Sequence, residues 1–161
     1  MKCLLAGILG FVSVCLPAAA LELVPWEGSL PSDAILAGHE GGGSELAVCV
    51  VSDWGGQHPG ALTEDGTCRV AWGGQEHLVS HGLLVLVGGS ADDGEWVAAE
   101  EGSVPGNAFR AGGDDGGPLY VCRAPVDNGL VPGKLTDHGW CYVAHDGEEH
   151  YFVTDYEVLV E

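Results

Sequence analysis

Short runs rich in β-branched and aromatic residues recur along the chain, separated by turns that contain glycine or proline. Such runs favour strands, because these side chains fit a pleated sheet and because Gly and Pro interrupt helices. Regular spacing of short strands and turns is typical of antiparallel sheets. The pattern therefore predicts an all-β protein. The expected strands cover residues 45–51, 67–72, 83–87, 95–99, 119–124, 140–145, 151–154 and 156–160.

The second half of the chain repeats the pattern of the first. Shifting residues 46–87 forward by 73 positions places Cys49 on Cys122 and Cys68 on Cys141, and it also superposes two Pro-Gly pairs. Upstream the shift becomes 74, so one residue is missing from an acidic turn of the second copy. Self-similarity of this kind indicates an internal duplication. We expect two repeats, 21–88 and 89–161, that pack into one compact unit with pseudo-two-fold symmetry.

The first residues have the three-part pattern of a secretory signal. A lysine at position 2 precedes an almost wholly apolar run, which ends in small residues up to Ala20. A membrane anchor is the alternative, but spanning a bilayer takes about 20 apolar residues, and this run is shorter. We expect residues 1–20 to be a cleaved signal peptide, no membrane span elsewhere, and secretion of the mature protein.

The formal net charge of −19 limits the choice of partners. Binding to a phosphate backbone depends on Lys and Arg, and the chain has only five of them, so nucleic acid is not an expected partner. The excess of acid can simply serve solubility. Calcium binding or an acidic recognition face are the alternatives.

Four cysteines remain after the expected cleavage: Cys49, Cys68, Cys122 and Cys141. Four cysteines allow three pairings. The duplication favours Cys49 with Cys68 and Cys122 with Cys141, since each copy then closes its own loop. A zinc site is the competing interpretation, but zinc cysteines usually occur as C-x2-C pairs, which are absent. Disulfides are consistent with secretion.

Signals for catalysis or metal binding are weak. There is no G-x-S-x-G motif. His77 and His81 have the spacing of two metal ligands but lack the glutamate of H-E-x-x-H. The Asp-Asp-Gly sequences at 92–94 and 114–116 fall short of a calcium loop and are explained as turns. We expect a protein without enzymatic activity and without a cofactor, with calcium as the alternative.

Two neighbouring features of the second copy carry opposite charges. Asp114 lies in a glycine-rich sequence, and Lys134 ends a Pro-Gly-Lys sequence that reads as a second turn. A carboxylate accepts hydrogen bonds and an ammonium donates them, so together they can hold adjacent sugar hydroxyls. Aromatic residues that could cover an apolar sugar face are Trp96, Tyr120, Trp140 and Tyr142. The alternative is a surface salt bridge worth less than about 1 kcal/mol.

The order of these motifs resembles the DM9 repeat, which occurs in tandem in invertebrate proteins and in some natterin-type toxins. The resemblance rests on Trp96, Val104-Pro105-Gly106-Asn107-Ala108, the acidic turn after Gly112, Leu119-Tyr120-Val121-Cys122-Arg123-Ala124, Val131-Pro132-Gly133-Lys134, Cys141-Tyr142-Val143, Gly147-Glu148-Glu149 and Tyr156-Glu157-Val158-Leu159. It implies a β-sheet protein similar to mannose-recognising lectins, which act as pattern-recognition molecules and self-associate. It places the sugar-binding acid on Asp114 or its neighbour Asp115, and the sugar-binding lysine on Lys134.

The first copy departs from the family pattern. The acidic position is kept as Glu40, but Ala61 stands in place of the lysine and Val50 in place of the arginine that follows Tyr-Val-Cys. We expect a degenerate first site at Glu40 and at most one working site per chain. The alternative function is a non-catalytic structural or interaction protein whose lectin site has decayed. A natterin-like pore former is disfavoured, because those proteins append a long membrane-inserting domain.

Overall fold

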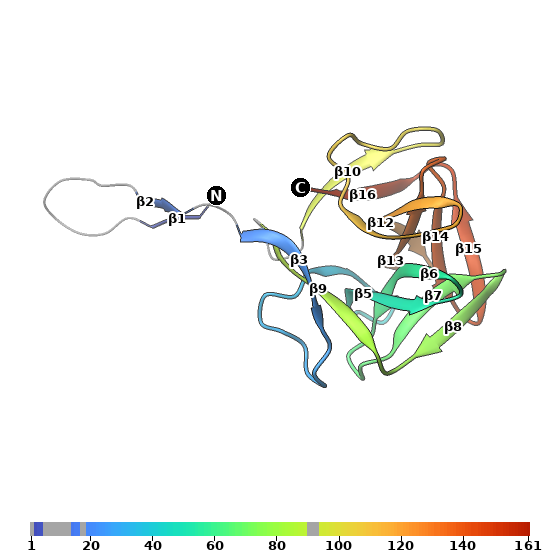
Figure 1. The fold of residues 1–161 in the computed structure, drawn as a ribbon, viewed down its shortest axis with the longest axis horizontal. Helices are drawn as coiled ribbons and strands as arrows, with labels where there is room; N and C mark the ends of the chain where they lie inside the picture. The colour runs from blue at the N-terminus through green and yellow to red at the C-terminus, as the bar shows by residue number, and fades with distance from the viewer. Residues whose placement is uncertain (1, 5–13, 17–18, 90–93) are drawn as a thin grey trace, which may run out of the picture.

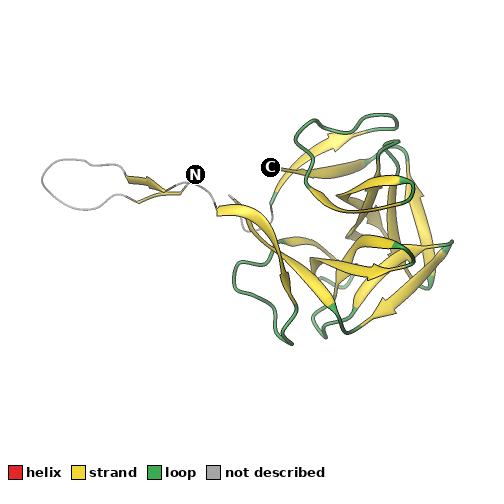
Figure 2. Cartoon of the chain, in the orientation of Figure 1, coloured by secondary structure: helices red, strands yellow, loops and turns green. Residues whose placement is uncertain are grey.

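The computed structural model describes residues 2–4, 14–16, 19–89 and 94–161, and every regular element in these ranges is a β-strand (Figures 1 and 2). All the strand pairings are antiparallel, which confirms the predicted all-β class. The strands are β1 Lys2–Leu4, β2 Val14–Leu16, β3 Ala19–Pro25, β4 Leu36–His39, β5 Glu45–Asp53, β6 Gly56–Leu62, β7 Cys68–Trp72, β8 Gln75–Val79, β9 Leu83–Gly89, β10 Glu95–Ala99, β11 Arg110–Asp114, β12 Gly117–Val126, β13 Gly129–Thr136, β14 Cys141–His145, β15 Glu148–Phe152 and β16 Tyr156–Val160.

The strands form two sheets of very different size. β1 and β2 pair only with each other, and the remaining strands make a 14-stranded sheet in the order β10-β16-β12-β11-β6-β7-β8-β15-β14-β13-β4-β5-β9-β3. Additional pairings of β12 with β13 and of β5 with β6 tie this sheet back on itself. The large sheet is therefore a strongly curved body, as Figure 1 shows.

The predicted turn that ends at Lys134 is wrong. Residues 132–134 lie inside strand β13, and the tight turn comes earlier, at Asp127 and Asn128, where φ is 45° and 63°. Pro-Gly looks like a turn in the sequence, but Gly133 serves close packing instead. A Cβ added there would lie 2.0 Å from the carbonyl oxygen of Tyr142 on β14. Only glycine lets the two strands approach this closely.

Each half of the chain pairs one of its strands with a strand of the other half. β4 of the first half pairs with β13 at His39 and Leu130, and β11 of the second half pairs with β6 at Gly113 and Gln57. These two pairings correspond to each other under the shifts of 73 and 74. β8 and β15 meet at Gln75 and Glu148, which are themselves 73 positions apart. All three pairings are consistent with the predicted pseudo-two-fold packing of the repeats, which stays a prediction. The repeat boundaries 21–88 and 89–161 stay a prediction.

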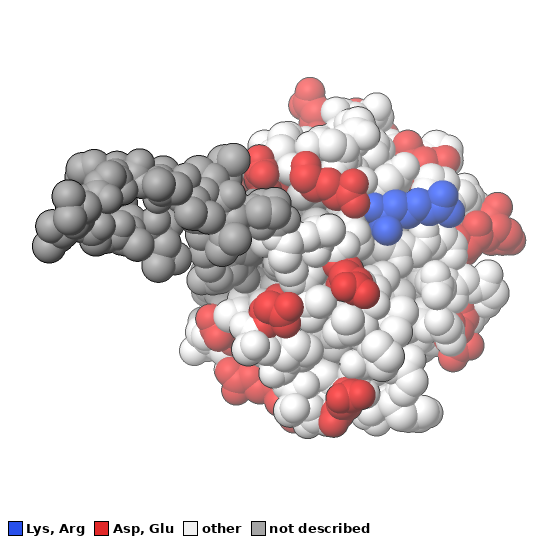
Figure 3. All heavy atoms as spheres, turned by 60° about the vertical axis from the view of Figure 1, so that its left-hand side comes forward, with Lys and Arg blue, Asp and Glu red and all other residues white. Residues whose placement is uncertain are grey.

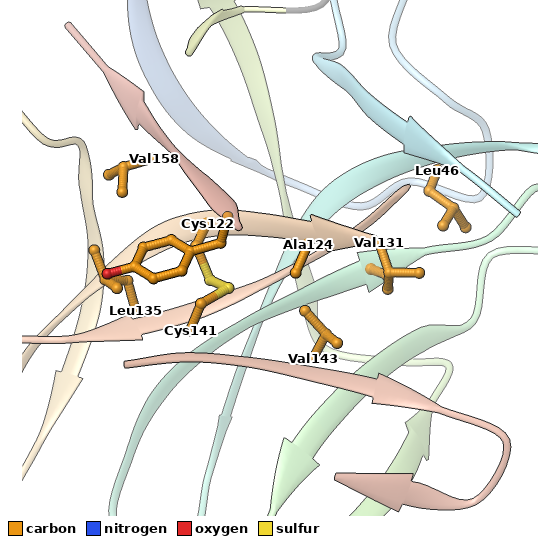
Figure 4. Packing of buried hydrophobic residues seen from close by; sticks show 10 residues of the cluster. Leu46, Cys122, Ala124, Val131, Leu135, Cys141, Val143 and Val158 are labelled. Carbon is orange, nitrogen blue, oxygen red and sulfur yellow. A yellow bond between two sulfur atoms is a disulfide. The ribbon is translucent and has the colours of Figure 1, made fainter. Parts of the chain in front are cut away.

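Buried apolar side chains form three clusters. One surrounds Cys49 and Cys68 in the first half, and a second surrounds Cys122 and Cys141 in the second half. Figure 4 shows the second cluster, with the disulfide between Ala124, Leu135, Val143 and Val158. The third cluster joins the halves through Val48, Val50, Leu86, Val121 and Leu159. Because the third cluster contains residues of both halves, it packs the two halves against each other.

Both disulfides have the pairing that the duplication favoured. Cys49 bonds Cys68 and Cys122 bonds Cys141, each across a separation of 19 residues with Cα atoms 6.0 Å apart. Closing a loop of this length stabilises the folded state by about 3 kcal/mol in the chain-entropy estimate. Buried disulfides of this kind are compatible with an extracellular protein.

The expected signal peptide falls largely outside the described residues. β3 begins at Ala19 and runs past the expected cleavage point after Ala20, with its later residues paired to β9. Within the described part of the chain, no helix is long and apolar enough to cross a membrane. The Asp-Asp pair at 92–93 also lies outside the described residues.

Candidate functional site

Lys134 projects from the middle of β13 and is buried, with 7% of its surface exposed. It lies opposite Tyr142 on β14, and its Nζ is 5.8 Å from the centre of the Tyr142 ring. Burial lowers the pKa of Lys134, while the nearby carboxylates of Glu149 and Asp114 raise it again. The ammonium group is therefore set among an aromatic ring and two carboxylates.

Asp114, and not Asp115, is the acid that accompanies Lys134. Asp114 is the last residue of β11 and is half-buried, and its Oδ1 accepts a hydrogen bond of 2.9 Å from the backbone N–H of Gly116. Asp115 lies at the exposed tip of the turn. The charge of Asp114 acts on the pKa of Lys134 and of His58, whereas Asp115 contributes to neither.

The two charges are near each other without forming a salt bridge. Among the described residues, the ion pairs involve Arg69, Arg123, His138 and His145 but not Lys134. A surface salt bridge, the alternative that the sequence left open, is therefore not what joins Asp114 and Lys134. The Lys134 ammonium can then donate to a ligand with hydroxyl groups, and Asp114 can accept from it with the capacity that its bond to Gly116 leaves.

Through Tyr142, Lys134 adjoins a group of three aromatic side chains. Trp140 stacks on Tyr151 with ring centres 5.4 Å apart, and Tyr142 lies 6.4 Å from Trp140 and 6.2 Å from Tyr151. Tyr151 is 61% exposed. An adjoining hollow of about 600 Å³ is lined by Glu101, Gly102, Thr136, His138, Trp140 and Tyr142. Flat aromatic faces beside polar side chains such as Glu101 and Thr136 can bind a ligand that has both an apolar and a polar surface.

The four aromatic residues named from the sequence fall into two groups in the structure, and their role in covering a sugar stays a prediction. Trp140 and Tyr142 lie at the site, whereas Trp96 lies under the guanidinium of Arg123, 4.2 Å from the ring centre, and Tyr120 packs against the second cluster. Tyr151 was missed. A signal for it existed, because β15 pairs with β14 so that Tyr151 lies directly opposite Tyr142. Finding it required the register of two strands.

His58 is the second residue that the sequence did not reveal. It comes from β6 of the first half and is fully buried; neither ring nitrogen forms a hydrogen bond of good geometry, and a weaker interaction with the Asp53 backbone raises its pKa. Burial lowers the pKa of His58, and the charge of Lys134 lowers it further. The site therefore combines residues of both halves. The sequence held one indication of a special role for His58: the equivalent residue in the second half is the apolar Val131.

The sequence predicted that the first site lacks a cation, because Ala61 replaces the lysine. In the structure, Arg69 supplies a positive charge there. Glu40 contacts Arg69, which lies on β7 directly opposite Ala61. Arg69 occupies the position equivalent to Tyr142, so the positive charge comes from the neighbouring strand and not from residue 61. This contact ties up the Glu40 carboxylate. A hollow of about 450 Å³ beside it contains further acids, including Glu64, Asp65 and Glu76.

Arg123 is part of the scaffold and not of the candidate site. Its Nε donates to Glu157 at 2.7 Å, and its Nη1 donates to the carbonyl oxygen of Ala37 at 3.0 Å. The second bond connects the two halves of the chain. Val50, the equivalent residue, lies in the shared third cluster. Its difference from Arg123 therefore concerns packing between the halves and not the first site.

The described residues contain no group of three or more His, Cys, Asp or Glu side chains that could hold a metal ion. His77 and His81, whose spacing suggested two metal ligands, do not lie on a helix. The Nε2 of His77 forms a hydrogen bond of 3.0 Å with the carbonyl oxygen of Trp72.

Comparisons with known proteins agree with this all-β architecture. A model of the DM9 repeat matches residues 61–152, which is more than half of the chain. The chain therefore belongs to the DM9 repeat family, as its motifs predicted. The matched region crosses the predicted boundary between the two repeats. No curated protein matches the sequence.

A similar fold occurs in the nematode sperm cell motility protein MFP2B. The TM-score is 0.54 at 12% sequence identity, and the match covers 89% of this chain and 45% of that chain. The chain thus spans less than half of the length of MFP2B. At this identity the likeness concerns the fold alone.

Proposed function

We propose that this protein is a secreted, non-enzymatic lectin that binds mannose-containing glycans and serves in pattern recognition. The observation that carries the proposal is the Lys134 ammonium, buried beside Asp114 and Glu149 and in no ion pair with any residue that the structure describes. A vicinal diol can accept from the ammonium and donate to a carboxylate at the same time. Hydrogen bonds to charged groups are the stronger ones.

The surroundings favour a neutral polyhydroxyl ligand. Acidic side chains are spread over the face shown in Figure 3, where basic side chains form only one small group. This charge disfavours nucleic acids and other polyanions. Trp140, Tyr142 and Tyr151 supply flat surfaces for the apolar face of a sugar ring.

The proposed binding uses the protein's own side chains and no cofactor. Hydrogen bonds that Lys134 donates and Asp114 accepts need no calcium, so binding should survive a chelator. A single shallow sugar site is weak, and useful avidity then requires several sites on one particle. We propose that the mature protein self-associates to provide them. Residues 1–20 would direct secretion, in agreement with the two disulfides.

A glycan array tests the proposal, with the mature protein applied in calcium and again in a chelator. Binding to mannose-rich glycans under both conditions is expected, and Lys134→Ala should abolish it. Asp115→Asn is the matched control, since this exposed residue changes the charge near the site without contributing to the pKa of Lys134. Binding that Lys134→Ala leaves at normal affinity would contradict the site. Binding that is lost only in chelator would replace it with a metal site.

The alternative is a non-catalytic structural or interaction protein that keeps the duplicated fold. The closed contact between Glu40 and Arg69 favours it, because the first half has no free carboxylate and cation at the family positions. No glycan binding by folded, disulfide-bonded protein would support this alternative.

A further inference from the structure

The first half carries a pair of tryptophans that the proposed site does not use. Trp54 follows β5 at its turn into β6, and Trp72 ends β7; their rings stack with centres 5.5 Å apart and planes 18° apart. His77 supports both, with its ring 4.7 Å from Trp54 and 6.1 Å from Trp72. Trp72 is 38% exposed. We call Trp54, Trp72 and His77 the tryptophan platform.

The second half of the chain lacks this platform, although Trp54 also packs against the core of the first half. The residues equivalent to the two tryptophans in the second half are Asp127 and His145, which form a polar contact of 3.0 Å in place of the stacked rings. Trp54 also adopts a φ of 47°, a left-handed conformation that bulky residues rarely adopt. Asp127 has nearly the same φ, 45°, and aspartate tolerates it better. Strain kept at a partly exposed aromatic residue points to a binding function.

Two turns connect the platform to the Lys134 site. Gly56, two residues after Trp54, packs against Asp114, because a Cβ added to Gly56 would lie 2.8 Å from the Asp114 Cβ. Gly74, two residues after Trp72, donates its N–H to Glu149 Oε1 at 3.2 Å, and its carbonyl accepts from the Glu149 N–H at 3.2 Å. Each carboxylate that flanks Lys134 thus adjoins a turn next to one of the two tryptophans.

We propose that the tryptophan platform is a second sugar subsite, which binds the ring next to the one held at Lys134. This inference rests on the proposed lectin function and makes an oligosaccharide of at least two units the preferred ligand. Indole faces stack on the apolar face of a pyranose. The carboxylates of Asp114 and Glu149, between the two subsites, accept from the hydroxyls of either ring.

The geometry favours a sugar ring over a cationic ligand. Cages for quaternary ammonium groups surround the cation with several aromatic faces. The two indoles are nearly parallel and cover each other, so they present a flat surface instead of a cage. A flat surface matches the flat face of a sugar ring.

The test compares mannose with α-linked mannobiose by isothermal titration calorimetry of the full mature protein. Wild-type protein should bind the disaccharide about tenfold more tightly, which corresponds to about 1.4 kcal/mol. The double variant Trp54→Asp with Trp72→His carries the pair that the second half tolerates at these positions. It should lose the disaccharide preference. The single variant Trp72→His, which keeps the contact of Trp54 with His58 at 5.8 Å between ring centres, should bind mannose within about twofold of wild type.

A control variant on the opposite side of Lys134, Tyr151→Ala, should weaken binding of both sugars. Wild-type protein that binds mannobiose no more tightly than mannose overturns the subsite and leaves the lectin function intact. An equal loss of both sugars in the double variant also overturns it. Wild-type protein that binds neither sugar overturns the lectin function and the subsite together. Binding of choline that needs the two tryptophans would reassign the platform to cations.

Discussion

The imidazole of His58 and the ammonium of Lys134, one from each half of the chain, are the two buried polar side chains of the described core. They interact through their charges, since Lys134 lowers the pKa of His58. Asp114 and Asp53 act in the opposite direction but less strongly than burial. Because burial outweighs these groups, protonation would place a second buried positive charge beside Lys134.

This relationship predicts destabilisation in mild acid. His58 has an ordinary pKa of 6.5 and a lower pKa in the folded state. The unfolded chain therefore binds the proton more readily as the pH falls below about 6.5. The stability that the neutral ring contributes is present above that pH and is lost as the pH decreases. Urea denaturation at about pH 7.5 and about pH 5.5 should show a lower free energy of unfolding in acid.

The variant His58→Val isolates this effect, because valine occupies the equivalent position 131. It removes the titrating ring and keeps a buried side chain. The decrease in free energy of unfolding between the two pH values should be smaller than in wild type. An unchanged pH dependence would assign the acid sensitivity to other groups, among them the many carboxylates of this chain.

Lys134 should reduce stability while it supports binding. Replacing Lys134 with Met removes a buried charge that forms no ion pair within the described part of the chain, and it keeps a side chain of similar length. We expect the free energy of unfolding to rise by about 1 to 2 kcal/mol, together with loss of glycan binding. Chemical denaturation and the glycan array measure the two effects. A destabilised Lys134→Met protein would show that the ammonium has a structural role.

The two aspartates of the acidic turn should differ in their effects. Asp114→Asn removes the carboxylate whose charge acts on Lys134, and it should weaken mannose binding about tenfold, since hydrogen bonds to charged groups contribute about 1.5 to 3 kcal/mol. Asp115→Asn makes the same chemical change one residue further along, at the exposed tip, and should leave affinity within about twofold. Calorimetry with mannose decides between them. A larger effect at Asp115 would reverse the assignment.

Local patterns predicted what depends on neighbours in sequence. Runs of β-branched and aromatic residues between turns indicated strands such as β5 and β16, and the duplication indicated the two disulfides. Residues that meet across the structure were missed. His58 reaches the site because β6 pairs with β11, and Arg69 reaches Glu40 because β7 lies beside Ala61. Pro-Gly-Lys was misread as a turn because only the packing against β14 shows that a strand needs the glycine.

The equivalence between the halves predicts that a second sugar site can be built in the first. Ala61→Lys with Arg69→Tyr restores the residues of positions 134 and 142, and it frees the Glu40 carboxylate from Arg69. Position 61 has the same register in the sheet as position 134, because Ala61 pairs with Val48 and Lys134 pairs with the equivalent Val121. The introduced lysine would therefore project from an equivalent point. Calorimetry with mannose should then give two sites per chain where wild type gives one.

Arg69→Tyr alone is the control for this design, because it frees Glu40 without supplying the ammonium. It should keep the single site of wild type. An unchanged stoichiometry in the folded double variant would mean that the aromatic residues at 140 and 151, which are Thr67 and Leu78 in the first half, are also required. Stacking surfaces would then be as necessary for sugar binding as the paired charges, since the apolar face of the ring would have nothing to cover it.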